Sequence, residues 1–325
     1  MTQQRARRFG LTIVGGLEAV GAILCLVTLT GFLGRLWWVF ELTSHFRFQL
    51  AVALGVLTLL WLALRRWRLA AVYAGFAAVN AFLVLSLLWP RATIATTSGP
   101  ALRLVQLNVH TANQRSDLVL NFLRNAEADV VLLMEVNERW MQDLEPLHTD
   151  YPYVLAEPRE DNFGIALFSR RPLINDKVIR LGSASVPSLV SELRVGTNSV
   201  LLLGTHPLPP GSSEYARLRN EQLKQVATYV RDQTLPVVVF GDLNTTPWSP
   251  CFTDLLHDGG LKNSSQGRGL FATWPAWLPA LARIPLDQCL VSRTVQVINK
   301  RCGPPVRSDH LPVLVEIQVK NSGSD

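Results

Sequence analysis

Acids, amides and histidines recur in this chain directly after short apolar runs. They stand in Leu107-Asn108, Met134-Glu135, Gly204-Thr205-His206, Gly241-Asp242-Leu243-Asn244 and Ser308-Asp309-His310-Leu311-Pro312. Short runs rich in Val, Leu and Ile are typical of buried strands, so strands are predicted to carry these side chains to one end of a sheet. The set, in this order, indicates a metal-assisted phosphoester site.

Phosphoester hydrolysis at neutral pH requires neutralised anionic oxygens, an activated water and a stabilised leaving oxygen. Glu135 offers a carboxylate at a strand end, and Asn108 can bring an amide oxygen beside it. Few, hard oxygen ligands completed by water are what Mg²⁺ prefers, with Mn²⁺ as the alternative ion. Asp242 and Asn244 point the same way if their strand continues, so one is predicted to hold the attacking water and the other a phosphate oxygen.

Two histidines extend this predicted site. His310 is a candidate acid, base or phosphoryl donor, provided that a carboxylate fixes its tautomer. Asp309 would point the opposite way in an extended segment, so Asp287 is the predicted partner of His310 and Asp309 is left to approach the metal. His206 adds an imidazole for the phosphate. Each motif alone also has an ordinary explanation, since Asp and Asn are common in turns; the combination favours catalysis.

Beyond residue 100, strand-like and helix-like periods alternate. The predicted strands are Leu102–Val109, Val130–Glu135, Ile165–Ser169, Ser199–His206, Pro236–Gly241, Leu286–Val291 and Leu311–Val319, and the predicted helices are Ser116–Ala126, Glu138–Leu147 and Glu214–Arg231. This α/β pattern predicts sheets packed together with helices on the outside.

The first hundred residues are of a different kind. Three apolar stretches, Gly10–Leu33, Phe48–Leu64 and Leu69–Trp89, are each near the ~20 residues that span a bilayer. Arginines cluster before the first stretch and between the second and third, which places both points on the cytoplasmic side. We therefore expect a membrane domain of three transmembrane helices (1–90), a linker (91–100), a catalytic domain (101–320) and a tail (321–325), with the multi-pass protein in the plasma (inner) membrane and the catalytic domain extracytoplasmic.

The net charge of +6 comes from the membrane part of the chain. Residues 1–99 hold nine arginines and two glutamates, so the rest is near neutral. Proteins that grip nucleic acid usually show a basic footprint, so the charge does not favour a nucleic-acid substrate. Three of the four cysteines lie in the soluble part. An extracytoplasmic compartment permits a Cys289–Cys302 disulfide, with free buried thiols as the alternative.

The motifs resemble the endonuclease/exonuclease/phosphatase superfamily, which includes deoxyribonuclease I-like nucleases, inositol-polyphosphate phosphatases and neutral sphingomyelinases. The resemblance spans Leu102 to Val319 and also includes Gly164–Arg170 and Leu286–Ser292. It implies a four-layer α/β sandwich, two packed β-sheets flanked by helices, and divalent-metal hydrolysis. It implies the following roles: Glu135 as principal metal ligand, Asn108 and Asp309 assisting, Asp242 on the water, Asn244 and His206 on the phosphate, and Asp287 with His310 as the supporting pair.

These observations predict a membrane-anchored Mg²⁺-dependent phosphoesterase acting on a lipid head group or small phosphoester. A nuclease acting on extracytoplasmic DNA or RNA is the first alternative, and a non-catalytic membrane module that binds phosphorylated ligands is the second. The segment Thr273–Leu281 carries two tryptophans near Asp287. They are predicted either to pack over the sheet as a lid or to enter the membrane interface, where aromatic residues are favoured.

Overall fold

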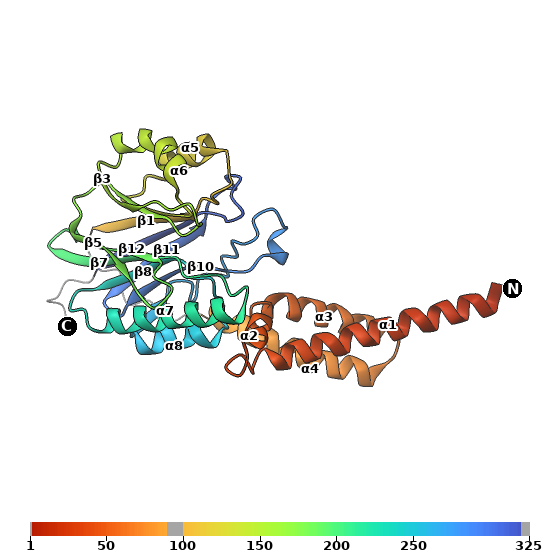
Figure 1. Cartoon of the computed structure of the whole chain (residues 1–325). Helices are drawn as coiled ribbons and strands as arrows, with labels where there is room; N and C mark the ends of the chain where they lie inside the picture. Colours follow the sequence, from red (N-terminus) through yellow and green to blue (C-terminus); the bar gives the residue numbers. More distant parts are fainter. Residues whose placement is uncertain (1, 90–99, 320–325) are drawn as a thin grey trace. The chain divides into compact units, whose positions relative to one another are not determined.

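The computed structural model describes residues 2–89 and 100–319, with side chains described from residue 13 onward. The predicted tail 321–325 and all of the predicted linker except Pro100 lie outside these ranges. The chain divides into two compact units, one formed by residues 1–86 and 248–250 and the other by residues 87–247 and 251–325. Figure 1 follows the chain through both units.

The N-terminal unit is helical. Its helices are α1 (Thr2–Thr30), α2 (Trp38–Ser44), α3 (Arg47–Ala63) and α4 (Trp67–Leu88). By length and composition α1 and α4 can each cross a membrane, and α2 with α3 make a third candidate if this pair, bent by 65°, counts as one span. The three predicted apolar stretches thus correspond to α1, α3 and α4, with α2 as an additional short helix.

A buried arginine joins three of these helices. Arg47, which opens α3, donates through Nη1 to the Thr28 carbonyl (2.9 Å) and to Asn80 Oδ1 (3.2 Å). Its guanidinium also lies 4.3 Å from the centroid of the Phe32 ring, and Asn80 donates to Thr28 Oγ1 at 2.9 Å. Buried polar groups are tolerated only when they are hydrogen-bonded, so this network ties α3 to α1 and α4.

The second unit contains two six-stranded sheets. The first has the order β11-β12-β1-β2-β4-β3 and the second the order β5-β6-β7-β8-β10-β9. Their bounds are β1 Ala101–Asn108, β2 Val130–Met134, β3 Tyr153–Glu157, β4 Ile165–Ser169, β5 Ile174–Arg180, β6 Pro187–Val195, β7 Asn198–Thr205, β8 Val237–Asp242, β9 Leu261–Asn263, β10 Asp287–Ser292, β11 Val295–Cys302 and β12 Val313–Val319.

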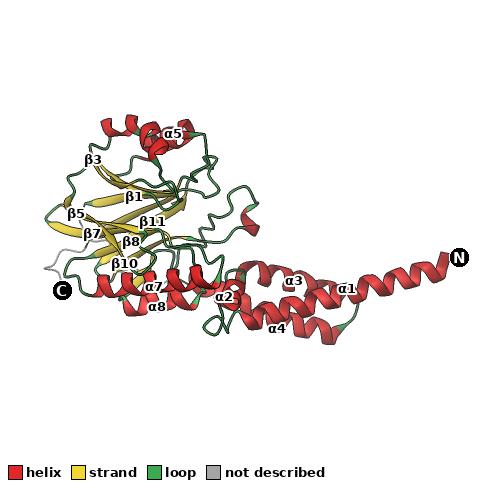
Figure 2. Cartoon of the chain, in the orientation of Figure 1, coloured by secondary structure: helices red, strands yellow, loops and turns green. Residues whose placement is uncertain are grey.

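Helices cover the outer face of each sheet, as Figures 1 and 2 show. The first sheet is covered by α5 (Ser116–Ala126), α6 (Glu138–Asp143) and the 3₁₀ helix η1 (Glu145–Thr149), and the second by α7 (Ser213–Arg231) and α8 (Pro250–Asp258). A further 3₁₀ turn, η2, spans Ala280–Ala282. The chain therefore folds as the predicted α/β sandwich of two sheets flanked by helices.

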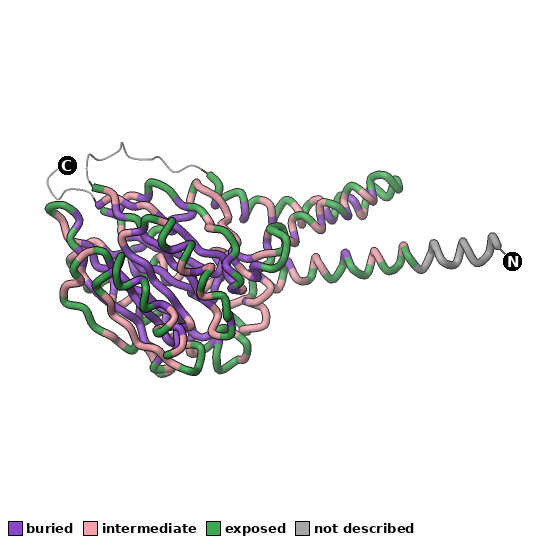
Figure 3. The backbone as a smooth tube through the Cα atoms, turned by 90° about the horizontal axis from the view of Figure 1, so that it is seen from above, coloured by how far each residue is buried: buried purple, intermediate pink, exposed green. Residues whose placement is uncertain are grey.

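Three apolar cores correspond to this layering, and Figure 3 shows the buried residues inside the unit with exposed residues around them. One lies between the sheets and includes Leu132, Leu202 and Phe240. The second joins the first sheet to Phe122 of α5 and Trp140 of α6, and the third joins the second sheet to α7 and α8. Strands buried on both faces read as continuous apolar runs, which is why β2, β4, β7 and β8 were predictable from the sequence.

The register brings the strand ends of the motifs together. β1 and β2 run parallel, so Asn108 pairs with Met134, directly before Glu135. β8 runs parallel to β7 and antiparallel to β10, and this antiparallel pairing places Asp242 opposite Asp287. Polar residues from distant parts of the sequence thus meet at one end of the sandwich.

The structure corrects several element predictions. The sequence analysis missed β3, β5, β6, β9, β11 and α8, and the predicted helix Glu138–Leu147 is divided into α6 and η1. β5 and β11 carry charged or amide side chains between their apolar ones and are partly exposed, which weakens an apolar-run signal. The structure describes all four cysteines and none of them is in a disulfide, so the predicted Cys289–Cys302 disulfide is absent from it.

Candidate active site

A close backbone approach fixes the position of Asp242 at the end of β8. Gly241 has φ +146°, and a Cβ at that position would lie 2.0 Å from the carbonyl oxygen of Thr205. Only glycine fits there without displacing β7. The Asp242 carboxylate is 2 % exposed, and its Oδ1 accepts from the Asn244 backbone N–H at 3.0 Å. Gly241 therefore allows β8 to carry Asp242 into a buried position beside β7.

His310 lies between two carboxylates. Its Nδ1 is 2.8 Å from Asp287 Oδ2, and its Nε2 is 3.4 Å from Asp242 Oδ2. All three side chains are buried. Burial lowers the pKa of His310, but the negative charges of Asp287 and Asp242 outweigh it and raise the pKa to about 10. The structure thus pairs His310 with Asp287, as predicted, and holds a protonated imidazole against Asp242.

His206 and Asn244 also lie beside Asp242. His206 Nε2 lies 3.7 Å from Asp242 Oδ2, and its ring packs 5.6 Å from that of Phe163. Asn244 donates through Nδ2 to the Pro207 carbonyl at 2.9 Å. The sequence analysis gave Asp242 and Asn244 a common direction on the condition that the strand continues, and this condition is not met, because β8 ends at Asp242 and Asn244 has φ +50°. A turn, rather than strand alternation, therefore sets the direction of the Asn244 side chain.

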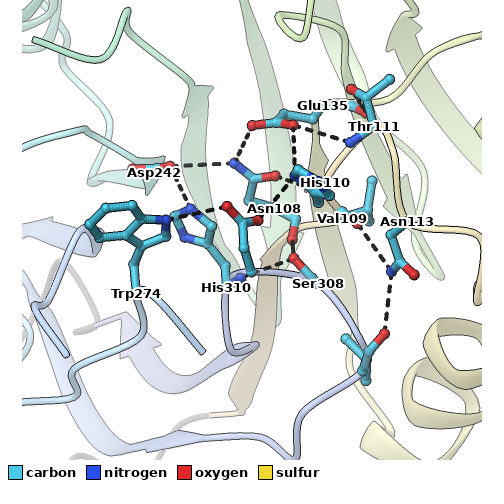
Figure 4. A network of polar contacts seen from close by, with 12 residues as sticks. Asn108, Val109, His110, Thr111, Asn113, Glu135, Asp242, Trp274, Ser308 and His310 are labelled. Carbon is cyan, nitrogen blue, oxygen red and sulfur yellow. Dashed lines mark hydrogen bonds and ion pairs between the residues drawn. The ribbon is translucent and has the colours of Figure 1, made fainter. Parts of the chain in front are cut away.

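Glu135 and Asn108 meet across β1 and β2. Asn108 Nδ2 donates to Glu135 Oε1 at 2.9 Å and approaches Asp242 Oδ2 at 3.4 Å, while its Oδ1 accepts from the His110 N–H at 3.0 Å. The Thr111 N–H donates to Glu135 Oε2 at 3.1 Å. Asn108 therefore links the Glu135 side of the site to the Asp242 side, facing both carboxylates with its amide nitrogen (Figure 4).

Asp309 reaches the same place from the loop before β12. Its Oδ2 accepts from the Trp274 indole N–H at 3.2 Å, and its backbone carbonyl accepts from the Ala276 N–H at 2.7 Å. Ser308 anchors the loop, since its Oγ donates to the Asn108 carbonyl at 2.6 Å and accepts from the His310 N–H at 3.0 Å. The alternation expected for Asp309 and His310 holds, with the two side chains facing different partners.

The structure also adds residues that sequence reasoning missed. His110 lies beside Glu135 (Figure 4) and 3.3 Å from Asp309 Oδ1. Arg219, fully buried on α7, donates to the Asn244 carbonyl at 2.9 Å. The sequence feature that could have indicated His110 as a site residue is its place two residues after Asn108. The feature that could have indicated Arg219 is its charge on the inward face of an amphipathic helix.

The donor set suits a hard divalent cation. Glu135 and Asp309 supply carboxylate oxygens, and Asp309 Oδ1 is buried without a hydrogen-bond partner, as expected of an atom whose natural partner is an ion. Among the described residues, the group of three His, Cys, Asp or Glu ligand atoms that lie within 4.8 Å of one another is Asp242, Asp287 and His310. Both ring nitrogens of His310 already face carboxylates, so this second cluster is better suited to proton chemistry.

Comparison with known families finds one matching family model. The model of the Endonuclease/Exonuclease/phosphatase family matches residues 105–310. This range contains every residue of the site described above. No curated protein matches the chain.

Several solved structures share the fold. An endonuclease/exonuclease/phosphatase from Bacteroides vulgatus is similar with a TM-score of 0.58 and 20% identity, over 68% of this chain and 99% of that one. The human Nocturnin catalytic domain with bound sulfate gives 0.56 and 19%, over 69% and 97%. D. rerio TDP2 complexed with single strand DNA product gives 0.56 and 15%, over 67% and 99%. At these identities the likeness establishes the sandwich fold.

Proposed function

Because the chain belongs to the Endonuclease/Exonuclease/phosphatase family, whose members are generally phosphoester hydrolases, we propose that it is a membrane-anchored Mg²⁺-dependent phosphoesterase acting on a lipid head group or a small phosphoester. One observation carries the proposal. A continuous set of contacts runs from Glu135 through Asn108 to Asp242 and on to His310 and Asp287. It combines oxygen ligands for a cation with a carboxylate and an imidazole placed for proton transfer.

Each side chain receives a role from its position. Glu135 and Asp309 hold the cation, and Asn108 assists by orienting Glu135. When bound, Mg²⁺ would neutralise phosphoryl charge. Asp242 orients and deprotonates the attacking water, because it is buried and has Asn108, His206 and His310 around it.

The remaining side chains act on the phosphoryl group. His310, kept protonated by Asp287, is suited to donate to a phosphoryl or leaving oxygen. His206 and Asn244 contact the phosphate.

The loop beside Asp309 supports a lipid substrate. Trp274 is directed to Asp309, but Trp277 is 69% exposed and Leu281 64% exposed on the same loop. Of the two tryptophans, Trp274 contacts Asp309 through its indole N–H, and membrane contact is our proposal for Trp277. Tryptophan is favoured at the depth of lipid head groups, which is where the phosphoester of a phospholipid lies.

Charge around the site supports the same choice. Three arginines near the Glu135 end each pair with an aspartate: Arg115 with Asp117, Arg139 with Asp143, and Arg159 with Asp161. Their cations are therefore partly neutralised, and a polyanion would find a weaker attraction than an unpaired basic track provides. The second candidate function, an extracytoplasmic nuclease, rests on the shared fold of TDP2, a protein seen with a DNA product.

The cellular arrangement belongs to the proposal as well. The apolar helices would anchor the protein in the plasma (inner) membrane, and the arginine clusters would leave the domain 101–320 outside the cytoplasm. A reporter fused after Asp325 tests this directly. Activity of a periplasm-dependent reporter is expected; activity confined to a cytoplasm-dependent one would refute the orientation.

The test of function uses the full chain in lipid nanodiscs with Mg²⁺. A water-soluble phosphodiester, phospholipid vesicles and plasmid DNA are offered in parallel to the unmodified protein, to Asp242→Asn and to the surface control Asp117→Asn. Lipid or small-ester hydrolysis that is lost only in Asp242→Asn is the expected result. DNA cleavage with the same dependence would establish the nuclease. A cellular function that survives Asp242→Asn and Glu135→Gln would point instead to a non-catalytic module that binds phosphorylated ligands.

A further inference from the structure

A short segment from the second half of the sequence belongs to the helical N-terminal unit. Trp248–Pro250 group with that unit, whereas the chain on either side of them belongs to the other unit. Ser249 is fully buried, and its Oγ donates to Glu41 Oε1 of α2 at 2.5 Å. The Trp248 indole N–H donates to the Leu83 carbonyl of α4 at 3.3 Å. Hydrogen bonds to two helices therefore hold this segment.

The contact with Glu41 is closely packed. Glu41 is 2% exposed. A carboxyl group held away from water is costly unless its oxygens are hydrogen-bonded, and the Ser249 hydroxyl supplies such a bond. A Cβ at Gly34 would lie 3.0 Å from Glu41 Cα and 3.2 Å from Pro250 Cγ, so glycine at this position lets the chain approach both. Removing the Ser249 hydroxyl or the Glu41 carboxyl would therefore leave a buried polar group without this partner.

The segment follows directly after the turn that carries Asn244. Only Thr245, Thr246 and Pro247 separate Asn244 from Trp248. Both threonines are fully buried, and the proline ring fixes its own φ. Three residues of chain cannot absorb a displacement of Trp248 without moving buried side chains, because protein interiors are close-packed. The position of Trp248 therefore constrains the position of Asn244.

The Asn244 turn needs support from its surroundings. Asn244 has φ +50°, a conformation that is uncommon for residues other than glycine and persists where the structure around it holds it. On the catalytic side, Arg219 Nη1 donates to the Asn244 carbonyl at 2.9 Å, and Asn244 Nδ2 donates to the Pro207 carbonyl at 2.9 Å. The chain that leaves the turn is held in the helical unit, so the two units fix the turn together.

We propose that the helical unit positions the catalytic turn, with Glu41 and Ser249 as positioning residues that act through the chain on Asn244. The proposal rests on the proposed function, in which Asn244 contacts the phosphate. The helices thus have a role besides anchoring, because the geometry of the site depends on their hold on Ser249. Since this role concerns the site and not access to the membrane, it applies to water-soluble substrates as well.

The test uses the full chain in lipid nanodiscs with Mg²⁺ and a water-soluble phosphodiester. Glu41→Ala and Ser249→Ala each remove one partner of the hydrogen bond, so either variant suffices if the other does not fold. Glu41→Gln is the rescue, because its amide oxygen still accepts from Ser249. Thr28→Val is the matched control, since it removes a buried hydrogen bond of the same unit, from Asn80 at 2.9 Å, that does not involve Ser249.

Two quantities are measured for each variant. The first is kcat/KM. The second is amide hydrogen exchange, read by mass spectrometry on a peptide that covers residues 243–249 and on a peptide from β8. The Asn244 N–H in the first peptide donates to Asp242 Oδ1 at 3.0 Å, so its exchange reports whether the turn is intact. Comparison with β8 separates a loosened turn from unfolding of the catalytic unit.

Glu41→Ala and Ser249→Ala should each lower kcat/KM by about 10–10²-fold, as expected when a catalytic contact is misplaced from a distance. Residues 243–249 should exchange faster in both variants while β8 is unchanged. Glu41→Gln should recover most of the activity, and the Glu41→Ala/Ser249→Ala double variant should be no worse than either single variant.

Unchanged exchange of residues 243–249 with a kcat/KM within about twofold of the unmodified value in Ser249→Ala would overturn the proposal. An equal loss of activity in Thr28→Val would overturn it too, because general instability of the helices would then explain the effect. Faster exchange of residues 243–249 in a protein that hydrolyses no phosphoester would uphold the positioning of the turn and reject the proposed function.

Discussion

Replacing Asp287 by asparagine removes the charge closest to His310 while keeping the size of the side chain. Asp287 Oδ2 is 2.8 Å from His310 Nδ1, and the remaining carboxylate, Asp242, is 3.4 Å from Nε2. Burial lowers the pKa of His310, and the two charges together raise it to about 10 from an ordinary value of 6.5. Without Asp287 the pKa of His310 should fall, because burial is then opposed mainly by Asp242.

The pKa shift implies a dependence of stability on pH. The rise from 6.5 to about 10 corresponds to on the order of 5 kcal/mol of stability, and the larger share is expected to depend on Asp287, which acts through both its charge and its hydrogen bond to His310. Because the folded pKa is raised, this stabilisation is complete below about pH 6.5, decreases as the pH rises, and is lost above about pH 10. Asp287→Asn should therefore be less stable at pH 7, and its stability should fall less between pH 7 and 10.

Activity should fall as well. A histidine without its orienting carboxylate loses both tautomer control and charge, so kcat should decrease by about 10²–10⁴-fold with little change in KM. KM should hold because Asp287 acts through its contact with His310 Nδ1 and is assigned no contact with the substrate.

Labelling of Cys289 by a thiol reagent reports unfolding, since this free cysteine is buried on β10. Unfolding midpoints are taken at pH 7, 9 and 10 in chelator for the unmodified protein, Asp287→Asn and Asp117→Asn. The reasoning is refuted if the unmodified protein and Asp287→Asn lose stability in parallel over this range. A kcat within about threefold of the unmodified value would refute the catalytic part.

Three further predictions use the same assays. Gly241→Ala should destabilise the fold by about 2–4 kcal/mol, because the added Cβ would lie 2.0 Å from the Thr205 carbonyl oxygen. Gly211→Ala is the control and should leave stability unchanged, because the space around Gly211 is open. Equal unfolding midpoints for the two variants in the Cys289 labelling assay would contradict this prediction. Burial lowers the pKa of Lys300 from 10.5 to about 8 in the folded protein. The buried ammonium group therefore destabilises the folded state by up to about 3 kcal/mol below pH 8, and this destabilisation disappears as the pH rises to about 10.5. Lys300→Met should lack this gain in stability with pH. If the stability of the variant rises with pH as steeply as that of the unmodified protein, the prediction is wrong. Trp277→Ser should slow hydrolysis of vesicle substrates several-fold and leave a water-soluble diester unaffected, with Tyr215→Ser as the exposed control; equal effects on both substrates would exclude a membrane contact.

Much of the fold could be predicted because the central strands are buried on both faces, so each of them is a continuous apolar run in the sequence. β2 and β4 were anticipated within a residue, and α5 was predicted with its observed bounds. The partly exposed strands β5 and β11 escaped detection because their polar side chains interrupt the apolar pattern. A strand that is buried on both faces can be recognised from its own residues, whereas a strand with one face open to water can be recognised only from its packing in the tertiary structure.

The sequence by itself determined which chemical groups this protein can use, because each acid, amide or histidine of the predicted site follows a run that folds as a strand or lies in a turn beside one. Tertiary structure decided how these groups pair. The antiparallel register of β8 and β10 set Asp242 opposite Asp287, and a turn rather than a strand directed Asn244. The approach of His110 to Asp309 joins β1 to the loop before β12. No local pattern encodes that contact, since it exists only when distant segments pack against each other.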